Sequence, residues 1–330
     1  MSQLNKKSAI IETFAEAALN HGKQMTAIEK SDYASAMELV KELASNPNPN
    51  NLYELNQIIA YTVDAVIDVR MDYMSKIAEV KNTAFDERPK FKIKTQNAQG
   101  FWQAVGATPQ KTKIGYKYDS LKIDALSARP ITEWAEVAAG RYDFAELTRD
   151  ITNDFEVKVA QKVQNTLYAT FSGLSSPNYA SGAGVTATFD TLLNSMMRLG
   201  GAAIIGDYEA LQKLPALTAI SGRTSNEIIN DLNRNGIIGT YKGAPVVSLT
   251  NPYTGLSGFN TVLDRGYIYI VPAVSDMNKT LKIQFAGGVQ SMQGQNIEDG
   301  SYEMRFDKHM GAGVIAGTRH ALAVYEDTTL

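Results

Sequence analysis

The residue types that carry most enzyme chemistry are sparse in this sequence. It has no cysteine, which excludes disulfides, thiolate metal sites and cysteine nucleophiles. Its three histidines, His21, His309 and His320, are far apart in the chain, and no two have the spacing of metal ligands. No phosphate-binding loop, dinucleotide-binding fingerprint, nucleophile elbow or zinc-protease motif occurs. We therefore predict no catalytic residue, no metal site and no cofactor.

Carboxylates are plentiful, but they follow one segment without forming an isolated pair. They are Asp143, Glu146, Asp150, Asp154 and Glu156. Because the segment has helical periodicity, we interpret these residues as the solvated face of a helix. The alternative is that an ordered carboxylate here binds a lysine of a neighbouring subunit.

Lysines gather in a different segment, where apolar and charged residues alternate. Residues 91–94, 113–118 and 121–124 each show a period of two, which predicts strands with one apolar and one polar face. Glycine and proline residues interrupt the middle of the segment, so its tip is predicted to be irregular. Lysines beside aromatic residues are also typical of base-stacking surfaces, but the alternation favours half-buried strands.

A two-stranded ribbon of this kind is only marginally stable by itself in water. The segments on either side are predicted to be helices, and they offer the ribbon no obvious core. We therefore predict that another copy of the chain covers the ribbon. The predicted inter-subunit contacts are Phe91, Ile93, Trp102, Ile114, Tyr116, Tyr118 and Leu121.

Helical patterns precede the ribbon. Residues 3–44 predict one or two amphipathic helices, with Ser31-Asp32 as an N-cap, and the proline-rich stretch Ser45–Asn51 ends them. Apolar residues that step by three or four then predict a helix over Leu52–Val80. Arg70 interrupts this stripe. Its head either reaches solvent or forms an inter-subunit salt bridge, and we include Arg70 and Tyr73 among the predicted inter-subunit contacts.

The rest of the chain mixes helices and strands. A second apolar stripe predicts a long helix over Arg141–Phe171, followed by a turn-rich connection over Ser172–Gly184. Beyond it we predict helices over 189–199, 208–213 and 226–233, and strands over 202–205, 240–249, 267–271, 281–285, 302–306 and 321–325. Strands and helices do not alternate regularly, which indicates an α+β fold.

The composition is that of an ordinary globular protein, with 330 residues, 44% of them hydrophobic and 20% charged. This length suggests about two domains, or one elaborate domain. A net charge of −3 argues against a protein that grips nucleic acid by neutralising phosphates. No apolar run approaches the roughly 20 residues of a membrane-spanning helix, and the first residues do not resemble a signal peptide.

The order of these parts resembles that of the major capsid proteins of tailed phages, which have the Hong Kong 97-type fold. GTYKGAPVVSL (Gly239–Leu249) is similar to the family's G-x-PV-V strand. IIGDYEALQKLPAL (Ile204–Leu217) is similar to the strand and helix that precede it, and HMGAGVIAGTRHALAVYED (His309–Asp327) is similar to the closing strands. The resemblance covers residues 85–330.

The resemblance implies a division of the α+β fold into five parts. These are a helical N-arm (1–86), a β-hairpin called the E-loop (87–131), a peripheral domain with a long spine helix (132–186), an axial domain (187–279) and strands that return to the peripheral domain (280–330). Some members of the family join an E-loop lysine to an asparagine of a neighbour. No motif selects one lysine here, and we do not carry that cross-link over.

The resemblance also implies a shell subunit. Its copies would form pentamers and hexamers of an icosahedral phage head that encloses double-stranded DNA, with no sequence-specific DNA binding and no membrane. Scaffold, portal and decoration proteins are further partners of such shells. Assembly would take place in the host cytoplasm, and the chain would then reside in the virion capsid.

Two other functions remain open at this point. One is an encapsulin-like nanocompartment shell of the same fold, which encloses protein cargo. The other is a soluble ligand-binding protein or enzyme whose site is not visible in the sequence. Nuclease-resistant DNA in purified particles favours the phage shell, an enzyme cargo favours the compartment, and a monomer with a ligand pocket favours the third.

Overall fold

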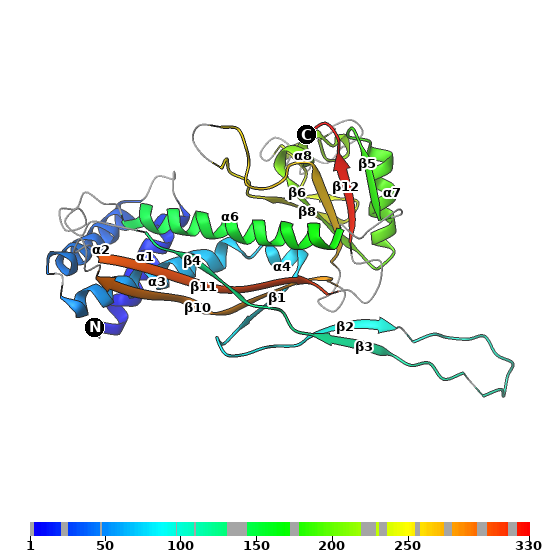
Figure 1. The fold of residues 1–330 in the computed structure, drawn as a ribbon, viewed down its shortest axis with the longest axis horizontal. Helices are drawn as coiled ribbons and strands as arrows, with labels where there is room; N and C mark the ends of the chain where they lie inside the picture. Colours follow the sequence, from blue (N-terminus) through cyan, green and yellow to red (C-terminus); the bar gives the residue numbers. More distant parts are fainter. Residues whose placement is uncertain are drawn as a thin grey trace.

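The computed structural model of the protein describes residues 3–20, 26–46, 48–96, 98–108, 110–130, 144–171, 178–218, 229–230, 236–254, 258–273, 279–295, 302–315 and 322–330. They form two sheets, a set of helices packed on them, and a thin two-stranded extension (Figure 1).

The described chain begins with the helices α1 (Gln3–Leu19), α2 (Ala27–Ser45), α3 (Pro49–Arg70) and α4 (Met74–Ile77). The start of α2 is a capping box, in which the Thr26 hydroxyl accepts from the Glu29 N–H and the Glu29 carboxylate accepts from the Thr26 N–H. Asn48 caps α3, and Pro49 occupies its first position, where the missing N–H leaves no hydrogen bond unmade.

Two predictions for this part of the chain are wrong. Ser31 and Asp32 lie inside α2, because the capping box at Thr26 starts the helix earlier. The helix predicted over Leu52–Val80 ends at Arg70, and α4 and the strand β1 (Glu79–Thr83) follow it. Parallel pairing with residues 282–286 holds β1 as a strand, and local periodicity cannot reveal so distant a partner.

A four-stranded sheet lies along the long helix α6 (Phe144–Phe171). Its strand order is β1-β10-β11-β4, with β10 at Leu281–Gln295, β11 at Tyr302–Val314 and β4 at Asp124–Ala128. β10 and β11 pair antiparallel over most of their length, with a bulge between Ala286 and Gln290. Figure 1 shows the axis of α6 lying roughly along the axes of these two long strands.

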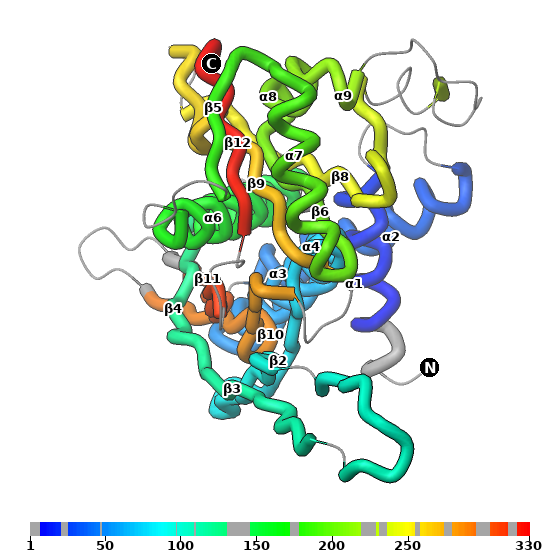
Figure 2. Tube along the Cα trace, turned by 90° about the vertical axis from the view of Figure 1, so that its right-hand side faces the viewer, coloured from blue at the N-terminus to red at the C-terminus, as the bar shows by residue number. Residues whose placement is uncertain are grey.

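A six-stranded sheet forms the second part of the molecule. Its order is β5 (Tyr179–Gly182), β12 (Ala323–Asp327), β9 (Tyr267–Pro272), β6 (Ala202–Asp207), β8 (Ala244–Leu249) and β7 (Thr240–Tyr241). The helices α7 (Thr186–Met197), α8 (Tyr208–Lys213) and α9 (Pro215–Thr218) accompany it. Figure 2 shows this sheet and α7 on one side of α6, and β10 and β11 on the other.

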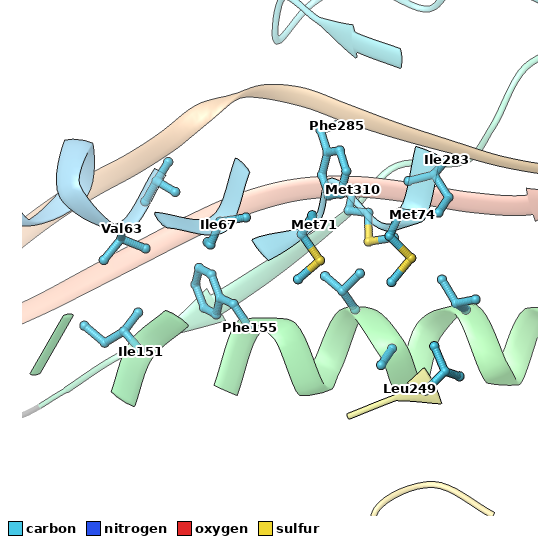
Figure 3. Packing of buried hydrophobic residues seen from close by; sticks show 14 of the residues in the cluster. Val63, Ile67, Met71, Met74, Ile151, Phe155, Leu249, Ile283, Phe285 and Met310 are labelled. Atoms are coloured by element: carbon cyan, nitrogen blue, oxygen red, sulfur yellow. The ribbon is translucent and has the colours of Figure 1, made fainter. Parts of the chain in front are cut away.

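The main hydrophobic core joins these parts. It contains Phe14 of α1, Ile59 of α3, Phe155 of α6 and Phe306 of β11, all with no exposed surface. Figure 3 shows α3 and α6 contributing side chains from opposite sides, with Ile283, Phe285 and Met310 of the sheet beside them. A second cluster, centred on Phe189 and Tyr325, fills the space between α7 and the six-stranded sheet.

Two lysines of the four-stranded sheet are buried as ion pairs. Lys282 has no exposed surface, and its Nζ lies 2.5 Å from Oε2 of Glu79 on β1. Lys308 is nearly as buried, and its Nζ lies 2.5 Å from Oδ1 of Asp64 on α3. Removing Glu79 or Asp64 would take the nearest carboxylate from a buried lysine, which costs about 3–5 kcal/mol.

Strands occur where they were predicted in the second half of the chain, but several differ from the prediction in length. The predicted strands over 281–285 and 302–306 are the starts of the much longer β10 and β11. The strand predicted over 240–249 is a hairpin of β7 and β8, turned by Lys242 and Gly243, which both have positive φ (48° and 83°). The connection predicted over 172–184 contains β5. All but two residues of the helix predicted over 226–233 lie outside the described residues.

Two observations concern the chain ends of the five-part division. The last strand, β12, pairs with β9 and β5 in the six-stranded sheet. Near the start of the chain, α1 to α3 contribute to the main core and β1 extends the four-stranded sheet. The five-part division itself stays a prediction.

We expect Phe14→Ala to lower the free energy of unfolding by about 3–5 kcal/mol, because it leaves a cavity beside Tyr33 in the main core. Urea unfolding followed by circular dichroism measures this change. The control is Ile28→Ala on α2, whose side chain is 75% exposed and should cost less than about 0.5 kcal/mol. Equal effects of the two substitutions would mean that the N-terminal helices are dispensable to the core.

Candidate functional site

The candidate site is the extension formed by residues 91–119, which we call the arm. β2 (Phe91–Gln96) and β3 (Gly115–Asp119) pair antiparallel and form a sheet of their own. The described residues between them form no strand, so the prediction of an irregular tip is confirmed. Figure 1 shows the arm leaving the body beside β1 and extending well past it.

The base of the arm is anchored on its own chain. Phe91 and Ile93 of β2 form a small buried cluster with Leu121 and with Ile315, the residue after β11. The ammonium group of Lys81 also lies over the Phe91 ring, at 4.6 Å from its centroid. Phe91, Ile93 and Leu121 thus have partners within the chain, and their predicted contact with a neighbouring subunit stays a prediction.

Glycines in β11 allow this close packing. A Cβ placed on Gly311 would lie 2.8 Å from the carbonyl oxygen of Lys122, and one on Gly313 would lie 2.6 Å from a methyl group of Leu121. The Gly-Ala-Gly sequence at 311–313 has no phosphate-binding context, and its structural role is to let the segment after β3 lie directly on β11. Sequence reasoning missed this role because the segment that crosses the glycines is distant in the chain.

The strand after the arm fastens it to the body. β4 pairs antiparallel with β11, from Asp124↔Met310 to Ala128↔Phe306. The Asp124 carboxylate lies 2.5 Å from Nζ of Lys162 on α6. The hydrogen bond from Lys162, helped by the charge of Lys122, holds the pKa of Asp124 below its ordinary value. Because the pKa of Asp124 is lower in the folded protein than in the unfolded chain, the Asp124–Lys162 ion pair stabilises the fold at neutral pH. This stabilisation is lost as the pH falls through the pKa of Asp124 and the carboxylate becomes protonated.

The outer part of the arm exposes large apolar side chains. Trp102 and Val105 are fully exposed, and Ile114, Tyr116 and Tyr118 are between 42% and 56% exposed. Single exposed apolar residues are normal on a protein surface, but a run of them on one thin projection marks an interaction site. Four of the seven predicted arm contacts are therefore exposed, and their contact with a neighbouring subunit stays a prediction.

The arm is also positively charged. It holds five of the chain's 32 basic residues and one of its 35 acidic residues, Asp119, so the rest of the chain has 27 basic against 34 acidic residues. Asp119 lies 3.6 Å from Lys117, and Lys92 lies over the Tyr116 ring at 3.8 Å from its centroid. The arm thus presents an aromatic and cationic surface, while the remainder of the molecule is acidic.

The two contacts predicted on the N-terminal part lie beside α6. The Arg70 guanidinium donates to Asn153 and, at 3.3 Å, to Glu156, so its ion pair is within the chain. The hydroxyl of Tyr73 is buried and has no hydrogen-bond partner among the described residues. Burial, together with the nearby charge of Glu156, raises the pKa of Tyr73. An inter-subunit role for Arg70 and Tyr73 stays a prediction.

Two cavities lined by charged side chains lie among the described residues. No group of three or more potential metal ligands occurs among them. A cavity of about 260 Å³ between β4 and α6 is lined by Asp124, Lys158 and Lys162, and one of about 410 Å³ by Arg129, Arg305 and Met292. None of the described helices is long and apolar enough to cross a membrane.

Solved structures share this architecture. A chain from Microbacterium phage Oxtober96 superposes with a TM-score of 0.51 at 10% identity, over 75% of this chain and 88% of that one. The capsid chain of an empty GTA particle gives 0.50 at 14% identity, over 77% and 88%. These similarities define the class: the protein has the Hong Kong 97-type fold of phage major capsid proteins, as the resemblance implied.

The family follows from the sequence itself. Residues 1–324 match the family described as SPbeta prophage-derived putative capsid protein YonB, so the chain belongs to this family of capsid proteins. No curated protein matches the chain.

We expect Gly311→Ala to displace the segment at Leu121 and Lys122, because the added methyl meets a backbone carbonyl that cannot rotate away. Overpacking of this kind costs about 1–3 kcal/mol. Hydrogen exchange should show faster exchange across β4, and urea unfolding should show the loss of stability. The control is Gly294→Ala in β10, where the new methyl would meet nothing within 4 Å. If Gly311→Ala changed neither hydrogen exchange nor stability, the base of the arm would not be packed tightly on β11.

Proposed function

We propose that this chain is the major capsid subunit of an icosahedral phage-like head, in which pentamers and hexamers enclose double-stranded DNA. The family and the fold are those of a capsid protein. The observation that supports assembly into pentamers and hexamers is the arm, which projects from the body with its aromatic residues exposed. Such a surface is completed when a neighbouring subunit covers it.

Shell closure does not require strong individual contacts. A single contact of millimolar affinity supplies only about 4 kcal/mol. Several such contacts per subunit act together, because each one raises the effective concentration for the next. An arm that is exposed in the single chain is therefore compatible with a stable container. Weak contacts also let misplaced subunits dissociate during assembly.

The charge of the chain suits a container for DNA. The molecule as a whole is slightly acidic, with a net charge of −3, and so does not bind DNA strongly through phosphate contacts. Packaged DNA must leave the shell again, which a strongly basic lining would oppose. Scaffold, portal and decoration proteins would complete such a head, assembled in the host cytoplasm. We propose a purely structural role with no enzymatic activity.

The test is electron microscopy of the expressed, purified chain in negative stain, followed by nuclease treatment of the particles. Closed shells with nuclease-resistant DNA support the proposal. Closed shells that enclose a co-purifying enzyme instead of DNA would favour a protein-cargo compartment. A monomer that stays monodisperse at high concentration, with or without candidate scaffold proteins, would contradict a shell function.

We expect the double substitution Ile114→Ser and Tyr116→Ser to leave the monomer folded but to lower the assembled fraction by about tenfold or more, since losing a buried interface aromatic costs about 2 kcal/mol or more. Size-exclusion chromatography measures assembly, and circular dichroism checks the fold. The matched control is Ile28→Ser and Tyr208→Ser, an exposed pair of the same residue types outside the arm. Unfolding of the arm variant would show that these side chains belong to the monomer's own core.

A further inference from the structure

A cavity at one end of the four-stranded sheet has an uneven set of charges on its wall. It has a volume of about 410 Å³, and it lies where β4 and β10 end and β11 begins. Its described lining residues include Arg129 and Arg305, and none of them is acidic. We call it the arginine cavity. Its volume falls within the range of ligand-binding cavities, and Figure 1 shows this end of β10 and β11 on the far side of the sheet from the arm.

A buried carboxylate holds Arg305 in place. Nε of Arg305 donates to Oδ1 of Asp307 at 2.8 Å, and Nη2 donates to Oγ of Ser127 at 3.2 Å. Burial opposes the charge of Asp307, but the hydrogen bonds from Arg305 and Ser127 hold the pKa of Asp307 below its ordinary value. The carboxylate is therefore ionised at neutral pH. The guanidinium group is fixed before any ligand arrives, which lowers the entropic cost of binding.

The cavity wall has hydrogen-bond donors to offer a ligand. An arginine carries five N–H donors. Two of them are engaged with Asp307 and Ser127, so the other three on Arg305 have no partner among the described residues. Gln293 also lines the cavity, and its amide oxygen accepts from Asn56. Its amide nitrogen has no such partner within the described part of the chain, so the wall favours a ligand that accepts hydrogen bonds.

We propose that the arginine cavity binds a carboxylate group carried by an apolar segment of a peptide. The two arginines less the Asp307 carboxylate leave one net positive charge, which matches a singly charged carboxylate. Guanidinium and carboxylate groups also match in shape, because two parallel N–H donors meet two oxygens. Met292 lies opposite Arg305 in the β10–β11 ladder and is 53% exposed, so it supplies apolar surface beside the charge.

A phosphate group fits this cavity less well. A phosphate monoester carries about two negative charges at neutral pH, which is more than the cavity balances. A DNA strand presents a row of phosphates, and a chain with a net charge of −3 has no excess of positive charge to attract it. The inference goes beyond the proposed function, because the cavity lies within a single chain and its occupancy does not require a closed shell.

The cavity between β4 and α6 provides an internal comparison, because it already contains a carboxylate. Asp124 lines it, and the Asp124 carboxylate lies 2.5 Å from Nζ of Lys162. Met310 lines this cavity, whereas Met292 and Met304 line the arginine cavity. The methionine methyl groups therefore report on the two cavities separately.

Nuclear magnetic resonance of methyl-labelled methionine in the full chain tests the inference. The probe is an end-blocked peptide with the sequence Ala-Leu-Glu-Leu-Ala. We expect the resonances of Met292 and Met304 to shift until they saturate, while the resonance of Met310 stays in place. The matched peptide with glutamine in place of glutamate should bind about tenfold or more weakly, because it cannot form charge-assisted hydrogen bonds.

Two substitutions locate the binding site. Arg305→Lys keeps the charge but removes the forked donor geometry. Gly294→Leu fills the cavity while both arginines remain, since a Cβ on Gly294 would meet nothing within 4 Å. Each should weaken binding of the glutamate peptide about tenfold. The control is Arg198→Gln, at an exposed arginine after α7, which should leave binding unchanged. Circular dichroism and the Met310 resonance check that each variant is folded.

The remaining outcomes decide between ligands or overturn the site. Absence of any shift at Met292 and Met304 up to about 10 mM peptide, well above the millimolar range of weak contacts, overturns it. Equal shifts at Met310, or equal weakening by Arg198→Gln, would reduce the binding to diffuse charge attraction. Inorganic phosphate or a short DNA duplex that shifts the same resonances at lower concentration than the peptide would assign the cavity to phosphate. A glutamine peptide that regains binding when its C-terminus is left free supports the site and identifies a chain terminus as the source of the carboxylate.

Discussion

The packing of α6 and α3 against each other and against the four-stranded sheet is the constraint on which the rest of the molecule depends. Phe155 has no exposed surface and lies among side chains from both sides of this contact (Figure 3). The six-stranded sheet is attached to the same helix, because Gln164 both donates to the carbonyl of Asp264 and accepts from its N–H. Glu156 links the two parts again, since it accepts from Arg70 and from Thr250. A single helix thus sets the position of each part.

Contacts with the body of the chain stabilise only the base of the arm. Its base is buried with Ile315 and fixed by the β4–β11 ladder, while its outer half exposes large apolar side chains such as Trp102 and Val105. The base therefore fixes the arm to the four-stranded sheet. The exposed outer half leaves room for a neighbour in the proposed shell.

The sequence predicted the elements with strong local signals and missed those that depend on distant partners. The arm, α6 and α8 follow from periodicity, and membership of the capsid class follows from the order of the parts. β1 and β5 were missed, because each is a short strand held by parallel pairing with a chain segment far away. Burial of Phe91 and Ile93 within the chain was missed for the same reason, since Ile315 lies more than two hundred positions later. Period-two alternation shows that one face of a strand is covered, but it does not identify what covers it.

The pairing of β1 with β10 has a consequence for synthesis on the ribosome. Residues 79–83 cannot join their sheet until residues 282–286 have emerged, so the core stays open until most of the chain has been translated. The arm is synthesised long before that moment. A nascent chain therefore exposes its aromatic arm while its own body is still incomplete, which makes this stage of synthesis the one most open to misfolding.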